Sequence, residues 1–509
     1  MLSATLAAAA LATASAQESG GGWRFARVLT ASNAGEDDQL GAGNALTGSA
    51  MAISRDGNTL VVAAPHEDSA TRGVGGNEMD EAAFDAGAVY VYERDGAAWA
   101  QQAYLKASNA QAGDQFGFAV ALSGDGNTLA VSANLEDSAA AGINGNQADE
   151  SAINAGAVYV FVRAGLTWTQ QAYVKASNIE AIDRFGYSVA LSDDGQTLAV
   201  GAVGEDSGST GMAGNQADNS AEQAGAAYVF VRSGTTWTQQ AYIKASNAQG
   251  GDLFGFCVAL SADGNTLGVC AYDEDSSAEG IDGDQADNRS SGSGAAYVMV
   301  RSGGSWRQQA YMKASNTTIQ GAFGAAIAMS ADGNTMAITA VDEDGLNPGV
   351  GAAPWQADRH ALDRTRVAED SAGAVYLYAR TGGRWAFDTY IKSSNIRAND
   401  TFGARLALSA DGSVLAAGAP QQPGGGTGVN PAAADASAPE SGAVYVFVRD
   451  GGRWRQDAYI KAPDAAEYDL FGSAVALSGN GRLLAAAAMG ADGRDNATRD
   501  AGAVYLFSR

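Results

Sequence analysis

Apolar and small residues alternate along short segments of this chain, and turns rich in Gly, Asp and Asn separate these segments. Alternation over residues 116–122 predicts a strand, and the Asp-Gly pair that follows is typical of a hairpin leading to a second strand over 128–133. A long polar loop then leads to an apolar run over 157–163, and a Gly-containing turn leads through Trp168 to a fourth strand. The pattern predicts a unit of four antiparallel strands, which we call A to D.

This unit is repeated along the whole chain. A tryptophan opens strand D of each unit, at positions 23, 99, 168, 237, 306, 385 and 454, with a spacing of 69 residues in four of the six intervals. The two longer intervals, which end at Trp99 and Trp385, indicate insertions in loops. Seven four-stranded units predict an all-β fold, a seven-bladed β-propeller. The lone strand D at 23–33 should complete a last blade with the lone strands A to C at 471–507 and so close the ring.

The first strand of each unit contains a Phe-Gly pair with a packing explanation. Phe116, Phe118, Val120 and Leu122 should face one neighbouring unit, while Gly117 and the small residues between them should let the other neighbour approach closely.

The N-terminal segment differs in composition from the repeats. Residues 1–16 form an Ala/Leu-rich stretch that ends in Ala14-Ser15-Ala16, which is typical of a secretory signal peptide and its cleavage site. We therefore expect a signal peptide over 1–16, a short linker over 17–22 and a single propeller over 23–509. The predicted location is secreted or periplasmic, and we expect no membrane insertion, since no other apolar stretch is long enough to span a bilayer.

Acidic residues outnumber basic ones by 57 to 31, which gives a formal net charge of −26 and makes nucleic acid a poor partner. Strand direction places the B–C loops and the D–A connections on one face, which we expect to be acidic; the D–A connections contribute Asp114, Asp183, Asp252, Asp400 and Asp469. The C–D turns lie on the opposite face and follow arginines at 94, 163, 232, 301, 380 and 449, so charge should be polarised between the faces. Near the end of strand D stand Lys106, Lys175, Lys244, Lys313, Lys392 and Lys461, which we expect to be solvated edge-strand charges that oppose aggregation.

The residues of one unit also resemble a known repeat. Phe185-Gly186 in strand A, the run 198–202 in strand B and the run 225–230 in strand C resemble the FG-GAP repeat of integrin α-subunit propellers and of secreted bacterial proteins. The resemblance implies a propeller and covers the chain after the N-terminal segment. Proteins with such repeats include adhesion subunits, lectins and some polysaccharide lyases, so the resemblance leaves the function open.

Calcium is the cofactor that the resemblance suggests, through an Asp-rich A–B hairpin. Here that hairpin retains only pairs such as Asp125-Gly126, which we interpret as type I′ turns, and one carboxylate per hairpin is too few for calcium. The B–C loops of units two to four are weaker calcium candidates: Asp137, Asn146 and Asp149, then Asp206, Asn215 and Asp218, then Asp275, Asp284 and Asp287. The alternative is that these residues form the Asx-turns that ordered loops require.

One unit departs from the others. The B–C loop of the fifth unit, residues 342–371, is longer and carries a candidate ligand-binding group of Trp355, Arg359, His360, Arg364 and Arg366. An aromatic side chain beside Arg and His could stack on a sugar or receive an acidic group. The alternative is a loop whose tryptophan packs on its own base.

The sequence gives little support for catalysis, because it contains two histidines, His66 and His360, and no repeated nucleophile–base pair. We therefore predict a non-catalytic binding, adhesion or structural module with a protein or glycan ligand on the acidic loop face. The alternatives are a carbohydrate-binding lectin and, third, a polysaccharide lyase.

Cys257 and Cys270, the only cysteines, should form a disulfide, since they face each other across the hairpin of the fourth unit. The alternative is two buried free thiols.

Overall fold

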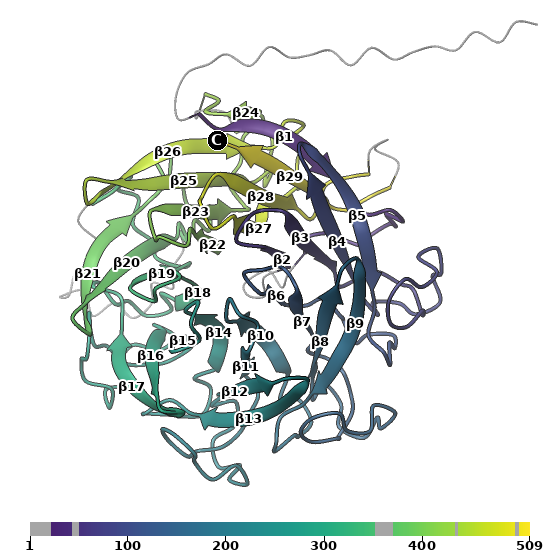
Figure 1. The fold of residues 1–509 in the computed structure, drawn as a ribbon. Coiled ribbons are helices and arrows are strands. Elements are labelled where there is room, and N and C mark those ends of the chain that lie inside the picture. Colours follow the sequence, from purple (N-terminus) through teal and green to yellow (C-terminus); the bar gives the residue numbers. More distant parts are fainter. Residues whose placement is uncertain (1–21, 43–49, 352–369, 433–435, 494–497) are drawn as a thin grey trace, which may run out of the picture.

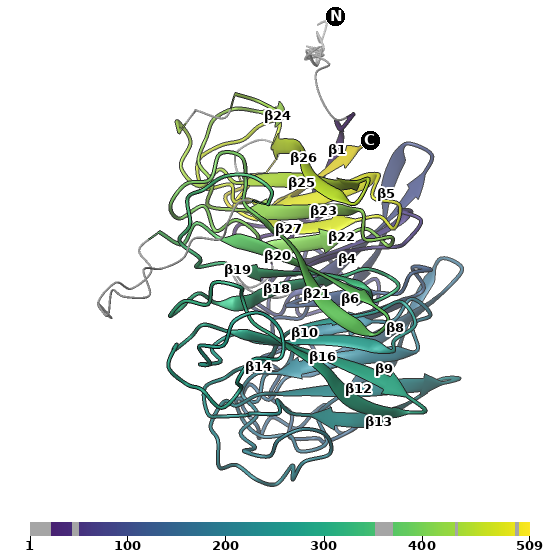
Figure 2. The ribbon, with the colours of Figure 1, turned by 90° about the vertical axis from the view of Figure 1, so that its left-hand side faces the viewer.

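The computed structural model describes residues 22–42, 50–351, 370–432, 436–493 and 498–509. In these residues it contains 29 β-strands and no helix. The strands form seven antiparallel sheets arranged as blades around a central axis (Figure 1), and the long B–C loops extend from one face of the ring (Figure 2). The predicted seven-bladed propeller is confirmed.

Strands A to D of each blade run from the axis to the outside of the ring (Figure 1). Blades 1 and 2 consist of β2 (Met51–Ile53), β3 (Thr59–Ala64), β4 (Ala88–Asp95) and β5 (Ala98–Leu105), then β6 (Val120–Leu122), β7 (Thr128–Ala133), β8 (Ala157–Ala164) and β9 (Thr167–Val174). Blades 3 and 4 consist of β10 (Phe185–Leu191), β11 (Thr197–Ala202), β12 (Ala226–Ser233) and β13 (Thr236–Ile243), then β14 (Phe254–Leu260), β15 (Thr266–Ala271), β16 (Ala295–Ser302) and β17 (Ser305–Met312).

The remaining blades include one with an additional strand. Blade 5 consists of β18 (Phe323–Met329), β19 (Thr335–Ala340), β20 (Ala374–Thr381) and β21 (Arg384–Ile391). Blade 6 consists of β22 (Arg405–Leu408), β23 (Val414–Ala419), β25 (Ala443–Asp450) and β26 (Arg453–Lys461), with β24 (Gly428–Val429) as a short fifth strand. Blade 7 consists of β27 (Phe471–Leu477), β28 (Leu483–Ala488), β29 (Ala503–Ser508) and β1 (Arg24–Leu29).

The two ends of the chain close the ring, as the sequence predicts. β1 pairs antiparallel with β29, so that Leu29 lies opposite Val504 and Arg24 lies opposite Ser508. The first strand of the chain is therefore strand D of the last blade.

A circle of backbone hydrogen bonds also closes the ring at the A–B turns. The N–H of Arg55 in blade 1 donates to the carbonyl of Gly124 in blade 2 at 2.9 Å, and the same bond links each turn to the next. The circle passes through Arg55, Gly124, Asp193, Ala262, Ala331, Ala410 and Gly479 and returns to Arg55, with every N···O distance between 2.8 and 3.0 Å. Every turn thus satisfies one of its backbone donors with its neighbour.

The A–B turns are not the predicted type I′ turns. The N–H of Ser123 donates to the carbonyl of Thr128 at 2.8 Å, which closes a loop of four residues, and Gly126 is the residue in it with positive φ. The Ser123 hydroxyl accepts the N–H of Thr128 at 2.9 Å, and the Asp125 carboxylate accepts both the Ser123 hydroxyl and the N–H of Asn127. These side-chain bonds stabilise a longer loop than the Asp-Gly pair alone requires. They also lower the pKa of Asp125 by stabilising its charged form.

Strand A reverses its side-chain pattern at the Phe-Gly pair, so the predicted alternation is wrong there. Gly117 has φ +103°, and a Cβ on it would lie 2.9 Å from the carbonyl oxygen of Ala88. Because of this irregularity Phe116 packs on Tyr159 of its own blade, with ring centroids 5.4 Å apart, whereas Phe118 packs on Tyr187 of blade 3, also at 5.4 Å.

In blades 1 to 6 the B–C loop returns and pairs with the outer edge of strand D. The contacts are Val74–Leu105, Ile143–Val174, Met212–Ile243, Ile281–Met312 and Val350–Ile391, and β24 against β26 in blade 6. The edge strands are thus covered, which removes the need for protective charges on them.

The lysines near the end of strand D are consequently buried, and the prediction of solvated charges is wrong. Lys175 has no exposed surface, and its Nζ lies 2.6 Å from the Glu136 carboxylate, which is itself buried. Glu136 also accepts the Tyr173 hydroxyl at 2.6 Å. The same ion pair joins Lys106 to Glu67, Lys244 to Glu205, Lys313 to Glu274 and Lys392 to Glu343.

The two remaining blades change this pair in different ways. In blade 6, Gln422 replaces the acid and accepts the Lys461 Nζ at 3.3 Å. In blade 7, Ala491 and Thr30 stand at the two positions, so the acid and the base are lost together. In blade 7, therefore, no charge stays buried at these two positions.

The aspartates of the D–A connections are also buried. Asp114 accepts the N–H of Gln111 at 3.1 Å, and Asp183 accepts the N–H of Glu180 at 2.8 Å. Burial raises the pKa of both carboxyls to about 8. They therefore contribute little of the exposed negative charge that was predicted for the loop face.

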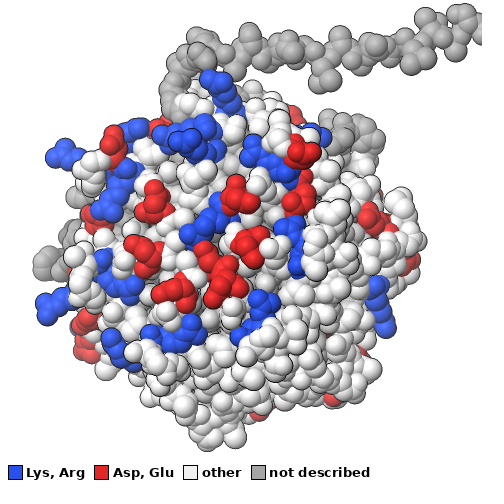
Figure 3. Space-filling model, in the orientation of Figure 1, with Lys and Arg blue, Asp and Glu red and all other residues white. Residues whose placement is uncertain are grey.

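The opposite face, which carries the A–B and C–D turns, is mixed in charge rather than basic. Acidic residues gather towards its centre and basic residues lie around them (Figure 3). Exposed aspartates of the A–B turns, such as Asp125, contribute to the acidic part. Arg301, near the end of β16, lies over the Trp306 ring and donates to Gln240 of the preceding blade at 3.1 Å, so it also joins two blades.

Candidate functional site

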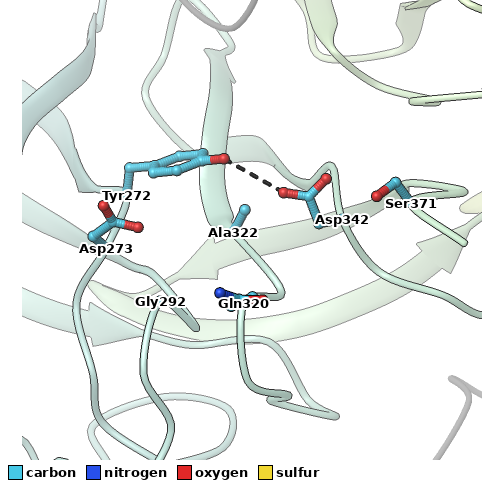
Figure 4. A pocket seen from close by; sticks show the side chains of 7 residues that line it. All are labelled: Tyr272, Asp273, Gly292, Gln320, Ala322, Asp342 and Ser371. Carbon is cyan, nitrogen blue, oxygen red and sulfur yellow. Dashed lines mark hydrogen bonds between the residues drawn. The ribbon is translucent and has the colours of Figure 1, made fainter. Parts of the chain in front are cut away.

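A polar pocket lies between blades 4 and 5 on the face of the B–C loops. Its volume is about 290 Å³, and its lining is Tyr272, Asp273, Gly292, Gln320, Ala322, Asp342 and Ser371 (Figure 4). Three connections supply these residues: the β15–β16 loop, the β17–β18 connection and the two ends of the β19–β20 loop. Neighbouring blades thus build the pocket together.

The pocket coincides with a departure from the repeat. The position that differs comes directly before the buried glutamate of the B–C loop, shortly after strand B. In blades 6 and 7 it comes before Gln422 and Ala491, which replace the glutamate. Blades 2 and 3 have Leu135 and Gly204 there, whereas blades 4 and 5 have Asp273 and Asp342. These are the two blades in which that position is a carboxylate. A comparison of the repeats would have found this signal in the sequence.

The side chains of the pocket face one another (Figure 4). The Tyr272 hydroxyl donates to Asp342 Oδ2 at 3.4 Å, and the Tyr272 ring stacks on Phe256 with centroids 4.4 Å apart. The stacked ring fixes the direction in which the hydroxyl points. Tyr272 therefore belongs to both the aromatic packing near the axis and the wall of the pocket.

Electrostatics make the two carboxyls easier to protonate than free aspartates. Burial raises the pKa of Asp273, and the negative charges of Asp275 and Asp342 raise it further. Burial also raises the pKa of Asp342, although hydrogen bonds from Ser371 and Tyr272 act in the opposite direction. A hydrogen-bond donor or a cation in the pocket would relieve this repulsion.

The blade-five candidates Trp355, Arg359, His360, Arg364 and Arg366 lie outside the described residues. The described ends of the same loop are Asp342 and Ser371, which both line the pocket. The ligand-binding role of this loop therefore stays a prediction.

The calcium candidates of the B–C loops make separate local hydrogen bonds. Asp137 accepts the N–H of Asn154 at 2.7 Å, while Asn146 and Asp149 each accept an N–H two residues further on. The equivalent residues accept N–H groups in the same way: Asp206, Asn215, Asp218, Asp275, Asp284 and Asp287. In the described part of the chain, no group of three or more His, Cys, Asp or Glu side chains is placed to hold a metal ion. Calcium binding stays a prediction.

The predicted disulfide between Cys257 and Cys270 is present, with the two Cα atoms 5.1 Å apart. It joins β14 to β15 next to the paired residues Val258 and Val269. The bridge thus lies in the β14–β15 hairpin, and the loop that follows this hairpin supplies Tyr272 and Asp273 to the pocket.

Comparison with known proteins places this architecture in a family. Four segments, residues 99–161, 168–230, 237–299 and 454–507, match the model of the FG-GAP repeat. The chain is therefore an FG-GAP repeat protein. No curated protein sequence matches it. Within the described residues, no helix is long and apolar enough to cross a membrane.

Solved structures resemble the fold at low sequence identity. Hydrazine synthase from Kuenenia stuttgartiensis matches with a TM-score of 0.45 and 14% identity, over 86% of this chain and 92% of that one. The periplasmic gluconolactonase of Pseudomonas aeruginosa matches with a TM-score of 0.43 and 16% identity, over 82% and 86%. A putative 6-phosphogluconolactonase from Bacteroides uniformis matches with a TM-score of 0.42 and 10% identity, over 82% and 86%. These similarities are too weak to carry a functional argument.

Proposed function

We propose that the protein is an exported, non-catalytic binding module whose ligand enters the pocket between blades 4 and 5. One observation carries this proposal: the two blades that place a carboxylate before the buried acid are the two that form the pocket. The disulfide and the FG-GAP repeats are consistent with export to an oxidising compartment.

The chemistry of the lining limits the ligand. Asp273 and Asp342 offer carboxylate acceptors, Tyr272 offers a hydroxyl, and Gln320 offers an amide. A volume of about 290 Å³ is at the lower end of the range of roughly 300–1,000 Å³ for ligand sites. The pocket therefore suits one sugar ring or one basic side chain of a protein, which are the glycan and protein ligands expected for this face.

The composition of the pocket supports binding rather than catalysis. Its lining offers carboxyls, a tyrosine and an amide, with no histidine, cysteine or lysine among the described residues. The described histidine, His66, pairs with Asp85 at 2.9 Å in blade 1. A lyase would need a base and a charge-stabilising group directed at one substrate position.

The experiment compares the unmodified protein with the double variant D273N/D342N in a glycan array and against a library of Lys- and Arg-containing peptides. We expect at least one ligand whose affinity falls at least about tenfold in the double variant, since two charged acceptors of its hydrogen bonds become neutral amides. The matched control is D149N, because Asp149 is on the same face and Asn keeps its acceptor oxygen. The proposal is contradicted if every ligand binds D273N/D342N as tightly as it binds the unmodified protein. It is also contradicted if the protein forms unsaturated products from an acidic polysaccharide.

A further inference from the structure

Grooves of a second kind lie on the outside of the ring, where strand D of one blade meets the C–D turn of the next. We call them rim grooves. The groove between blades 3 and 4 has a volume of about 370 Å³ and is lined by Gln216, Gln239, Gln240 and Trp306, among others. The groove between blades 1 and 2 has a volume of about 330 Å³. Strands β5, β13 and their equivalents form the outermost layer of the ring in Figure 1, so the grooves open away from the axis.

The two rim grooves share a Gln-Gln-Trp set, although the first also contains Glu78, which accepts a hydrogen bond from Gln101 Nε2 at 3.2 Å, where the second has Gln216. Gln101, Gln102 and Trp168 in the first occupy the positions of Gln239, Gln240 and Trp306 in the second, two repeats later. The sequence contains the same set twice more, as Gln170, Gln171 and Trp237 between blades 2 and 3 and as Gln308, Gln309 and Trp385 between blades 4 and 5. Blades 5, 6 and 7 replace the Gln-Gln pair by Phe387-Asp388, Gln456-Asp457 and Phe25-Ala26. The complete set therefore occurs four times, on one side of the ring.

The inner glutamine of each pair has a structural role. The Trp306 Nε1 donates to Gln240 Oε1 at 3.0 Å, and the equivalent bond recurs at 3.0 Å between Trp237 and Gln171. This bond joins each blade to the next and leaves little of the inner amide for a ligand.

The outer glutamine has one polar atom without a hydrogen-bond partner in two of the four grooves. Gln239 Nε2 is bonded to the Ser177 hydroxyl at 2.9 Å, while its Oε1 is buried and has no hydrogen-bond partner among the described residues. Gln170 is in the same situation, with Nε2 bonded to Ser108 at 3.0 Å. If the amide were turned over, its nitrogen would lack a partner instead. One polar atom of this amide thus lacks a partner in either orientation, and because that atom is buried, the side chain must turn outwards to bond to a ligand.

The lining between blades 3 and 4 contains no charged side chain, and its polar groups are amides that both donate and accept hydrogen bonds. Hydroxyl groups match such a surface, whereas an ion would lose its hydration without gaining a counter-charge. We propose that the four rim grooves are a repeated set of sites for a neutral glycan, each holding one part of the same chain or a branch of it. These sites are separate from the pocket between blades 4 and 5.

Four equivalent sites also predict how binding depends on ligand size. A single sugar unit should bind weakly to each groove, whereas a polymer that reaches several grooves gains avidity of about 100-fold or more without new contacts. Removal of the grooves should therefore weaken polymer binding much more than binding of a short oligosaccharide.

The test uses affinity gel electrophoresis and calorimetry with soluble xylan, galactomannan and dextran as neutral probes, and polygalacturonate as a charged probe. The variant Q101L/Q170L/Q239L/Q308L replaces the outer amides by apolar groups of similar size. We expect at least one neutral polysaccharide to bind the unmodified protein, and its affinity to fall at least about 100-fold in the fourfold variant. The single variants Q170L and Q239L should each have a smaller effect, and they carry the test if the fourfold variant does not fold.

The matched control is Q456L, since Gln456 bonds to Ser394 at 2.9 Å as Gln239 bonds to Ser177 but has Asp457 beside it. Q456L and D273N/D342N should bind the polysaccharide normally, which separates this proposal from the pocket of the preceding section. The proposal is overturned if no neutral probe binds, if the fourfold variant binds as well as the unmodified protein, or if Q456L loses affinity to the same extent.

Discussion

Replacing Lys244 by Met should destabilise blade 3 by about 3–5 kcal/mol, because the substitution leaves a buried carboxylate without its cation. Lys244 has no exposed surface, and its Nζ lies 2.6 Å from Glu205, which is 2% exposed. The remaining donors to Glu205 are neutral: the Tyr242 hydroxyl at 2.5 Å, the Asn178 amide at 3.0 Å and a backbone N–H. They cannot replace a unit charge in a site that excludes water.

The size of the effect should depend on the partner. The double variant E205Q/K244M removes both charges and keeps an acceptor for Tyr242, as Gln422 does for Tyr459 at 3.0 Å in blade 6. It should be more stable than K244M by about 1–3 kcal/mol, since no charge stays buried.

Hydrogen exchange gives a local measurement, because repeat proteins can open one unit at a time. The opening free energy of amides in β11 to β13 is compared with that of the equivalent amides in β19 to β21, which serve as an internal control. The reasoning is refuted if K244M loses less than about 1 kcal/mol, or if E205Q/K244M is no more stable than K244M.

Three further predictions concern the stability of the fold. Deletion of residues 17–34 removes β1 and should lower the melting temperature, so an unchanged melting curve would contradict the closure of blade 7. The pKa values of Asp114 and Asp183, raised by burial to about 8 from an ordinary value of 3.8, make the folded state bind protons more tightly, so stability should fall between pH 5 and pH 8, and less so in D114N/D183N. Reduction of the Cys257–Cys270 bridge should cost about 1–3 kcal/mol, and two free thiols in the denatured, unreduced protein would exclude it.

The fold could be predicted from the sequence because its signals are local and repeated. The turn type was wrong, yet the facing pair of Cys257 and Cys270 was right. Lengthening the loop from two to four residues shortens each strand by one residue. The remaining residues therefore face the same partners in both cases. An error in the turn therefore left the strand register unchanged.

The buried lysines could not be recognised from one strand at a time. The end of strand D looks like an exposed edge until the B–C loop is seen to return over it, as Ile143 does opposite Val174. A signal was nevertheless present in the sequence. Where blade 7 has Ala491 in place of the acid it also has Thr30 in place of the lysine, and such paired changes are expected of residues that neutralise each other.

The pocket was missed for a different reason. The sequence predicts ligand binding by the long blade-five loop, and the two ends of that loop, Asp342 and Ser371, line the pocket. The sequence period does not predict that Tyr272 and Asp273 of blade 4 face these residues. Contacts between blades depend on the closed ring rather than on any one repeat.

The energetic cost of the pocket argues for its use. Blades 2 and 3 show that Leu135 or Gly204 is compatible with the same fold at the position of Asp273 and Asp342. Burial raises the pKa of both carboxyls, and the charge of Asp342 raises the pKa of Asp273 further. In blades 1 to 5 the buried glutamate of the B–C loop has a lysine beside it, and in blade 7 both the acid and the lysine are replaced. Two carboxyls kept beside a pocket, at a position that Leu135 and Gly204 can also occupy, support the proposal that a ligand donates hydrogen bonds to them.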